Sequence, residues 1–259
     1  MGISIPGRIY LKLRGLAATA GYDVQIKRKR TTKGPSVPKG KAFSPITTPA
    51  TYSPWLADKE FLSIREKVKD HTMVDVLRLY ELWQLVDESR KLSGAIIEVG
   101  AWRGGSGAVM ARRAQLSGIK EAVYVCDTFK GVVKAGKKDT YYKGGEHFDT
   151  SATIVRALMK KNGLGNARVL EGTFPDETGH LVKEKTIRLC HIDVDVYQGS
   201  KDIVRWLWPR LCIGGMIIYD DYGFQTAQGV TAFVEEERTR SDRIVIYNLN
   251  GHAIVVKTR

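Results

Sequence analysis

The chain has 259 residues, of which 43% are hydrophobic and 27% charged, and its formal net charge is +13 at pH 7. This length is enough for one α/β domain with an N-terminal extension, and no run approaches the roughly 18 apolar residues that a membrane-spanning helix needs. The first residues lack the apolar core and cleavage site of a signal peptide. The three cysteines, Cys126, Cys190 and Cys212, show no zinc-site spacing. We therefore expect a cytoplasmic protein with reduced thiols.

Positive charge is concentrated at the N-terminus. Residues 1–41 contain ten Lys and Arg residues and one acid, so this segment carries nine of the thirteen net positive charges. Residues 31–54 are rich in Pro, Thr, Ser, Gly and Lys, a composition typical of a linker or flexible cover. We therefore predict a basic arm with a linker or lid over residues 1–56 and a folded domain over residues 57–259.

Two interpretations of the basic arm stay open at this point. It is either a solvated tail or a weak contact for an anionic membrane, which would hold the protein at the inner membrane face. Nucleic acid is the less favoured partner, because no aromatic residues are interleaved with the basic cluster of residues 27–30.

Helical and strand patterns alternate from residue 57 onwards. We predict helices over 57–69 and 72–91, followed by short apolar strands, mostly separated by helical segments, at 95–99, 122–126, 167–171, 187–192 and 214–219. A turn at 248–251 joins two further strands, 243–247 and 252–257, into a hairpin. This order predicts an α/β, doubly wound, Rossmann-like sheet, mostly parallel with one antiparallel strand, and helices on both faces.

The most informative segment is EVGAWRGGSG, residues 98–107, which follows the first strand. Glycines let backbone amides approach a ligand closely, and the start of a helix offers unpaired N–H groups. Asp127 ends the next strand, where an acid can bind the two hydroxyls of a ribose. Gly172, Thr173 and Phe174 follow the third strand, where they would flank an adenine. The pattern predicts a nucleoside-containing cofactor.

Nicotinamide dinucleotides do not suit this loop. Their G-x-G-x-x-G motif is broken because Gly100 is followed by Ala101 and Trp102, and the bulky Trp102 would lie where a pyrophosphate needs close approach. S-adenosylmethionine, which has no phosphates, fits better. The predicted cofactor-binding residues are Glu98, Gly100, Ala101, Trp102, Gly104, Ser106, Asp127, Thr128, Gly172, Thr173, Phe174 and Asp193.

Acidic residues follow the fourth and fifth strands. Asp193 and Asp195 come after the fourth, and Asp220 and Asp221 come after the fifth. Neighbouring parallel strands would bring Asp193, Asp220 and Asp221 together, and a hard divalent cation such as Mg²⁺ would relieve their repulsion. The alternative is that Asp220 caps the following loop and Asp195 caps the helix that begins near residue 197, and we retain that interpretation for Asp195.

The chain resembles the TylF-type macrocin O-methyltransferases in several segments: the EVGAWRGGSG loop, Asp127–Gly131, the segment with Asp193 and Asp195, and GGMIIYDDYG. Members of this family are class I S-adenosylmethionine enzymes that methylate sugar hydroxyls on natural products, and the resemblance runs from about Thr51 to about Arg238. It implies a Mg²⁺-dependent O-methyltransferase acting on a hydroxyl of a sugar, a glycosylated natural product or a polysaccharide. It also implies Asp193, Asp220 and Asp221 as metal ligands and Asp193 as the general base.

The segment 134–150 lies where this family has a variable lid. It contains His147, which is either a base or substrate contact or an idle loop histidine. His191 is expected in the core, and His252 has no evident partner. The acceptor is expected to present vicinal hydroxyls to Mg²⁺, and a partner chain in a homo-oligomer could complete the lid.

Two other functions compete with methyl transfer. Asp193-Val194-Asp195 is a D-x-D sequence, typical of metal-dependent glycosyltransferases that use a nucleotide sugar, but that function leaves the glycine loop and the Asp220-Asp221 pair unexplained. A noncatalytic binding module recruited by the basic arm is the other alternative. The intact acid cluster argues against it, because buried acids are costly to retain without a use.

Overall fold

The computed structural model describes residues 43–44, 46 and 50–259. The predictions of a basic arm, and of its contact with a membrane or nucleic acid, fall mainly on residues outside these ranges. Within the described part of the chain, no helix is both long enough and apolar enough to span a bilayer.

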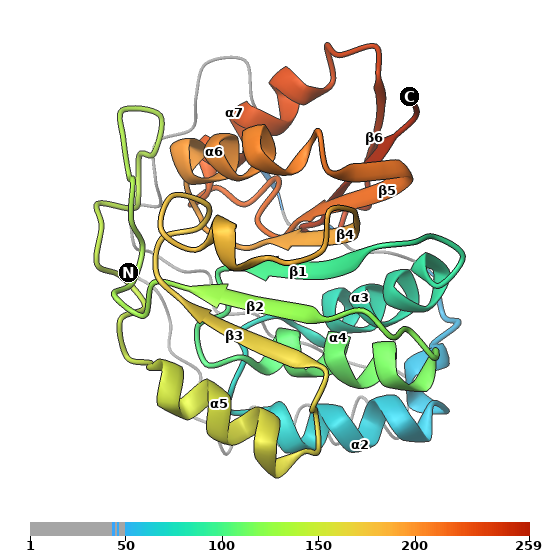
Figure 1. Cartoon of the computed structure of the whole chain (residues 1–259). Helices are drawn as coiled ribbons and strands as arrows, with labels where there is room; N and C mark the ends of the chain where they lie inside the picture. The colour runs from blue at the N-terminus through green and yellow to red at the C-terminus, as the bar shows by residue number, and fades with distance from the viewer. Residues whose placement is uncertain (1–42, 45, 47–49) are drawn as a thin grey trace, which may run out of the picture. The chain divides into compact units, whose positions relative to one another are not determined.

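A seven-stranded sheet forms the centre of the domain, in the order β3-β2-β1-β4-β5-β7-β6 (Figure 1). The strands are β1 (Ala95–Val99), β2 (Val123–Asp127), β3 (Ala167–Glu171), β4 (Ile187–Ile192), β5 (Leu211–Tyr219), β6 (Arg243–Tyr247) and β7 (Ala253–Lys257). The pairs from β3 to β5 are parallel, whereas β7 is antiparallel to both β5 and β6. The predicted mostly parallel sheet with one reversed strand is confirmed.

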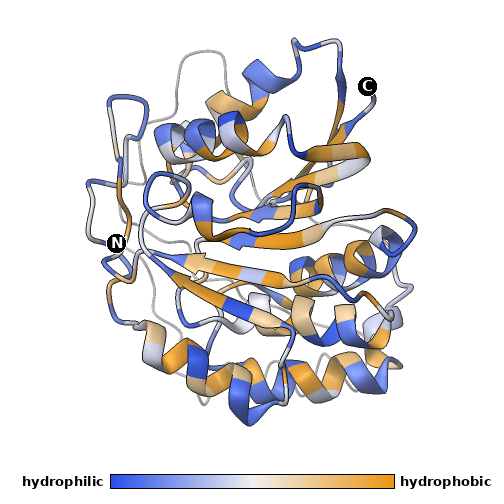
Figure 2. Cartoon of the chain, viewed as in Figure 1, coloured by the Kyte–Doolittle hydropathy of each residue, from blue (hydrophilic) through white to orange (hydrophobic). Residues whose placement is uncertain are grey.

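Helices cover both faces of this sheet. They are α2 (Lys59–Val68), α3 (Val76–Ser89), α4 (Gly105–Leu116), α5 (Ala152–Lys161), α6 (Tyr197–Leu207) and α7 (Gln228–Glu237), with short 3-10 helices η1 (Pro54–Leu56) and η2 (Gly179–Leu181). The apolar residues of α2 to α5 form one core with one sheet face, and those of α6 and α7 form a second core with the other. Figure 2 shows the strands as largely hydrophobic and the helices as banded, which is the pattern of a two-faced sheet.

Helix α3 begins four residues later than the sequence predicts. The Thr72 hydroxyl accepts a hydrogen bond from the Val74 backbone N–H at 3.1 Å, and the Asp75 carboxylate accepts one from Leu77 N–H at 2.8 Å. These side chains hold a turn before the helix, so Asp75 becomes its N-cap. The fifth strand, in contrast, begins earlier than the sequence predicts, because β5 starts at Leu211 rather than at residue 214.

Candidate active site

The glycine loop brings the end of β1 against the end of β4. Gly100 has a φ of +93° and Gly104 one of +84°. A Cβ added at Gly100 would lie 1.7 Å from the backbone oxygen of Asp193, so no other residue fits there. The Asp193 N–H in turn donates to the Val99 carbonyl at 2.9 Å. The loop and the first acid of the cluster are therefore built as one unit.

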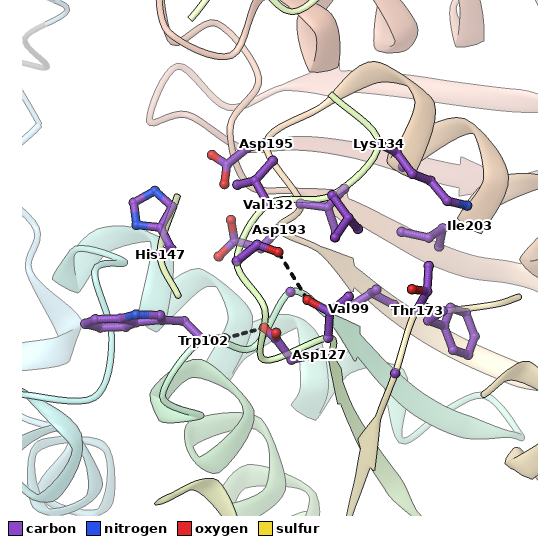
Figure 3. Close-up of a pocket in the computed structure, with 18 of the residues that line it drawn as sticks. Val99, Trp102, Asp127, Val132, Lys134, His147, Thr173, Asp193, Asp195 and Ile203 are labelled. Carbon is purple, nitrogen blue, oxygen red and sulfur yellow. Dashed lines mark hydrogen bonds between the residues drawn. The ribbon is translucent and has the colours of Figure 1, made fainter. Parts of the chain in front are cut away.

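Asp127 is held by the same loop. Its carboxylate accepts hydrogen bonds from the backbone N–H groups of Trp102, at 2.8 Å, and Phe129, at 2.6 Å. Burial raises the pKa of Asp127, and these N–H groups partly offset the rise. Figure 3 shows the Asp127 side chain at the cavity wall with the bond to Trp102 drawn. The acid is therefore fixed at the end of β2 in the cavity wall, and its contact with a ribose stays a prediction.

A cavity opens at the carboxyl ends of the parallel strands (Figure 3). Eight of the predicted cofactor-binding residues line it, namely Gly100, Trp102, Asp127, Thr128, Gly172, Thr173, Phe174 and Asp193. The sequence missed several of the remaining lining residues, which are mostly apolar: Met73, Val99, Gly131, Val132, Val133, Val194, Gly199 and Ile203. Gly131 and Val194 lie inside recognised motifs, but these motifs did not mark them as lining residues, and apolar positions such as Val132, Val133 and Ile203 carry no chemical signal in the sequence.

Four predicted contacts, Glu98, Ala101, Gly104 and Ser106, do not line the cavity. Glu98 is fully buried, with Oε1 3.1 Å from Nδ1 of His191. A Cβ added at Gly107 would lie 2.5 Å from its Oε2, so this glycine makes room for the carboxylate beneath α4. Glu98 therefore lies beneath the loop, and a contact of Glu98, Ala101, Gly104 or Ser106 with the cofactor stays a prediction.

The predicted acid cluster forms at the adjacent ends of β4 and β5. Asp193, Asp220 and Asp221, here called the acid trio, each offer an oxygen, and these atoms lie within 4.8 Å of one another. Burial, followed by the neighbouring carboxylates, raises the pKa of both Asp193 and Asp221 well above the ordinary value. Oxygen donors crowded in this way fit a hard divalent cation, so the donor chemistry agrees with a Mg²⁺ site.

Asp220 differs from the other two acids because one arginine and two histidines contact its carboxylate. Its Oδ1 lies 2.8 Å from Nε2 of His252 and 3.4 Å from Nε2 of His191, and its Oδ2 accepts from Arg78. Although burial opposes it, hydrogen bonds from the two histidines and the charge of Arg78 lower the pKa of Asp220. Asp220 therefore does not act as a simple loop cap, and His252, to which the sequence assigned no partner, also contacts Glu81.

His191 is a satisfied core residue, as expected. It is fully buried between Glu98 and Asp220. Burial alone would lower its pKa, but hydrogen bonds with Asp220 and Glu98 raise the pKa of His191 to about 9. The ring is therefore a protonated link between β1 and the acid trio.

Asp195 is not the helix cap that the sequence suggested. The side chain of Asp139, a lid residue, accepts instead from the Tyr197 N–H at 2.9 Å at the start of α6. Asp195 has a φ of +66°, lines the cavity and hydrogen-bonds Tyr142 and Asp221. Burial is the main reason why the pKa of Asp195 is raised. A non-glycine residue in this strained backbone region is common at functional sites.

Residues 128–151 contain no helix or strand and form one wall of the cavity. The Lys134 ammonium pairs with Asp176 at 2.6 Å and with Asp202 at 2.7 Å. At the other end of the 128–151 segment, the Asp149 carboxylate accepts a hydrogen bond from Trp102 Nε1 at 2.9 Å. His147 lines the cavity, and Figure 3 shows its ring near Trp102 and the carboxylates of Asp193 and Asp195.

Comparison with known proteins agrees with this geometry. The family model described as macrocin-O-methyltransferase (TylF) matches residues 63–249. The demethyldecarbamoylnovobiocin O-methyltransferase of Streptomyces niveus is 27% identical over 164 residues, which are 59% of this chain and 62% of that protein. The 8-demethyl-8-(2,3-dimethoxy-alpha-L-rhamnosyl)-tetracenomycin-C 4'-O-methyltransferase of Streptomyces olivaceus is 33% identical over 175 residues, 61% of this chain and 65% of that protein.

The chain thus spans slightly less than two thirds of the length of these two relatives. Among solved structures, the O-methyltransferase NovP superposes with a TM-score of 0.64 at 25% identity, covering 73% of this chain and 83% of that one. The family model covers well over half of the sequence, and the sheet, the glycine loop and the acid trio all lie within it or extend only slightly beyond it. The protein belongs to the TylF macrocin O-methyltransferase family.

Proposed function

We propose that this protein is a Mg²⁺-dependent O-methyltransferase that transfers the methyl group of S-adenosylmethionine to a hydroxyl of a sugar, in a glycosylated natural product or polysaccharide. One observation carries the proposal. A single cavity is lined at one part by Asp127, the ribose-type acid, and at another by Asp193 of the acid trio. The proposed cofactor site and the proposed site for sugar hydroxyls would therefore be continuous. The relatives named above as O-methyltransferases support the same conclusion.

The charge of the cavity favours this cofactor over a nucleotide sugar. Of the described residues that line the cavity, Lys134 is the only Lys or Arg, and it is already paired with Asp176 and Asp202. Asp127, Asp193 and Asp195 make the lining acidic. A diphosphate would find no unpaired Lys or Arg in this lining and would depend on the metal ion alone, whereas the acidic lining attracts a sulfonium cation. The residues thus argue for S-adenosylmethionine and against the glycosyltransferase alternative.

The remaining roles follow from the lining residues. Asp127 would bind the ribose hydroxyls, while Thr173 and Phe174 would border the adenine. Asp193, Asp220 and Asp221 would hold Mg²⁺, which when bound lowers the pKa of a coordinated hydroxyl and fixes its orientation. The 128–151 segment closes one side of the cavity and would exclude water from the reaction.

We assign the general base to Asp195 rather than to Asp193, which the sequence suggested. A carboxylate that ligates a cation has a reduced affinity for a proton, so Asp193 is poorly suited if it is a ligand. Asp195 lies outside the acid trio and lines the cavity, and burial raises its pKa, so its carboxylate would stay free to accept a proton while Asp193 holds the ion. His147, on the same side of the cavity, would contact the acceptor.

The proposal is tested by methyl transfer from labelled S-adenosylmethionine to a panel of sugars with vicinal hydroxyls, including L-rhamnosides. We expect transfer that EDTA abolishes and Mg²⁺ restores. Asp193→Asn should raise the Mg²⁺ concentration needed, while Asp195→Asn should lower kcat without changing that concentration. Transfer that is insensitive to EDTA would refute the metal role, and equal effects of the two variants on kcat alone would refute the separate assignments.

A further inference from the structure

A buried arginine contacts the acid trio from outside the cavity. Arg78 lies in the first turn of α3 and is 7% exposed. Its Nε donates to Oδ2 of Asp75 at 2.8 Å, and Asp75 is itself fixed as the N-cap of the same helix. The guanidinium also lies 5.1 Å from the centre of the Phe224 ring. The cation is therefore held in one position by the fold rather than by the trio alone.

The other end of this guanidinium binds Asp220. Nη1 of Arg78 donates to Oδ2, while His252 and His191 approach Oδ1 at 2.8 Å and 3.4 Å. Both carboxylate oxygens thus have protein partners. Asp193 and Asp221, the other two members of the trio, have no cation at hydrogen-bonding distance among the described residues. Among the described residues, the charge of Asp220 is therefore balanced by the guanidinium of Arg78, whereas Asp193 and Asp221 have no such counter-charge in contact.

We infer that Arg78 is a resident counter-charge of the acid trio, which holds Asp220 in position when no divalent ion is bound and limits how tightly the site binds one. The inference rests on the proposed metal-dependent function. An entering ion must share Oδ2 of Asp220 with the guanidinium or displace it, and in either case two cations lie close together in a buried environment. Such a site binds its ion more weakly than its three carboxylates alone would.

Calorimetric titration of the full-length protein with Mg²⁺ tests the limit on ion affinity. Arg78→Met removes the charge and keeps most of the volume, and we expect it to bind Mg²⁺ at least tenfold more tightly than the wild type. Arg78→Lys should stay within threefold of the wild type. The matched control is Arg113→Met, because Arg113 also pairs with an aspartate, at 2.9 Å, and stacks on an aromatic ring, at 4.9 Å, but on α4. Unchanged or weaker binding by Arg78→Met would overturn the inference.

Thermal melting in EDTA tests the counter-charge itself, independently of any metal. Arg78→Met should lower Tm by several degrees because Asp220 loses its partner, and adding Asp220→Asn should recover part of that loss. Additive effects of the two substitutions would refute the pairing. If neither the wild type nor Arg78→Met binds Mg²⁺, the proposed metal site and the limit on its affinity both fail, and this melting cycle alone decides whether Arg78 neutralises Asp220.

Discussion

Replacing Glu98 with glutamine is the most informative perturbation of the buried network below the site. Glu98 is fully buried and faces His191, whose other nitrogen faces Asp220. The glutamine keeps the shape of the side chain and an oxygen that accepts from the ring, but it removes one of the two carboxylate charges that keep His191 protonated. The change therefore isolates the charge of Glu98 from its packing.

The size of the effect follows from His191. Its pKa of about 9, against an ordinary 6.5, corresponds to about 3 kcal/mol of stabilisation of the protonated ring, shared between two carboxylates. Loss of one of them should cost about 1.5 kcal/mol at neutral pH, or roughly 3–6 °C in Tm for a domain of this size. Because the folded pKa is the higher one, this stabilisation is complete below about pH 6.5 and is lost as the pH rises through about 9.

Thermal melting between pH 6 and 9.5 measures both the size and the sign. The wild type should lose stability toward the alkaline end, and Glu98→Gln should start lower and lose less. Glu88→Gln is the control, since Glu88 is exposed and pairs with Lys91 on the surface. Parallel pH profiles for wild type and Glu98→Gln would show that the reasoning about this pair is wrong. Cofactor affinity should stay within threefold, because Glu98 does not line the cavity.

Three further substitutions probe the site. Gly100→Ala should abolish S-adenosylmethionine binding, since its Cβ would collide with the Asp193 backbone, whereas Gly163→Ala, also at positive φ but with no atom within 4 Å, should bind normally in the same titration. Asp195→Asn should lower kcat about 100-fold or more and flatten the acid limb of the pH–rate profile, because the proposed base is lost; an unchanged profile would contradict that role. Asp139→Ala should lower the free energy of unfolding by about 1–2 kcal/mol in chemical denaturation and raise the KM of the acceptor, because the Asp139 carboxylate joins the 128–151 segment to α6. An unchanged free energy of unfolding together with an unchanged KM would contradict this role.

Sequence reasoning succeeded where local chemistry determines position. The positions of the strands along the chain, the glycine turn after β1 and Asp127 at the end of β2 all follow from patterns within a few residues, and the neighbouring ends of β4 and β5 bring the acid trio together as predicted. The same reasoning failed where a partner lies far away in the sequence. The sequence indicates no partner for His252 because Asp220 and Glu81 are 32 and 171 residues away along the chain.

Arg78 and Asp139 show why the rest could not be predicted. Arg78 looks like an ordinary charged residue of an amphipathic helix, and only the fold brings it to Asp220. Asp139 lies in a loop without a motif, yet it supplies the hydrogen bond at the start of α6 that the sequence assigned to Asp195. Glu98 shows the opposite error. It lies inside the predicted cofactor motif, but its side chain faces His191 rather than the cavity.

Calorimetric titration of S-adenosylmethionine into the protein, with Mg²⁺ present, measures whether the cavity beside the acid trio binds this cofactor. We predict micromolar one-to-one binding that S-adenosylhomocysteine competes away and that Asp127→Ala weakens at least tenfold, with Asp70→Ala, an exposed acid away from the cavity, as the control. No heat with S-adenosylmethionine, together with binding of a nucleotide sugar, would contradict the account.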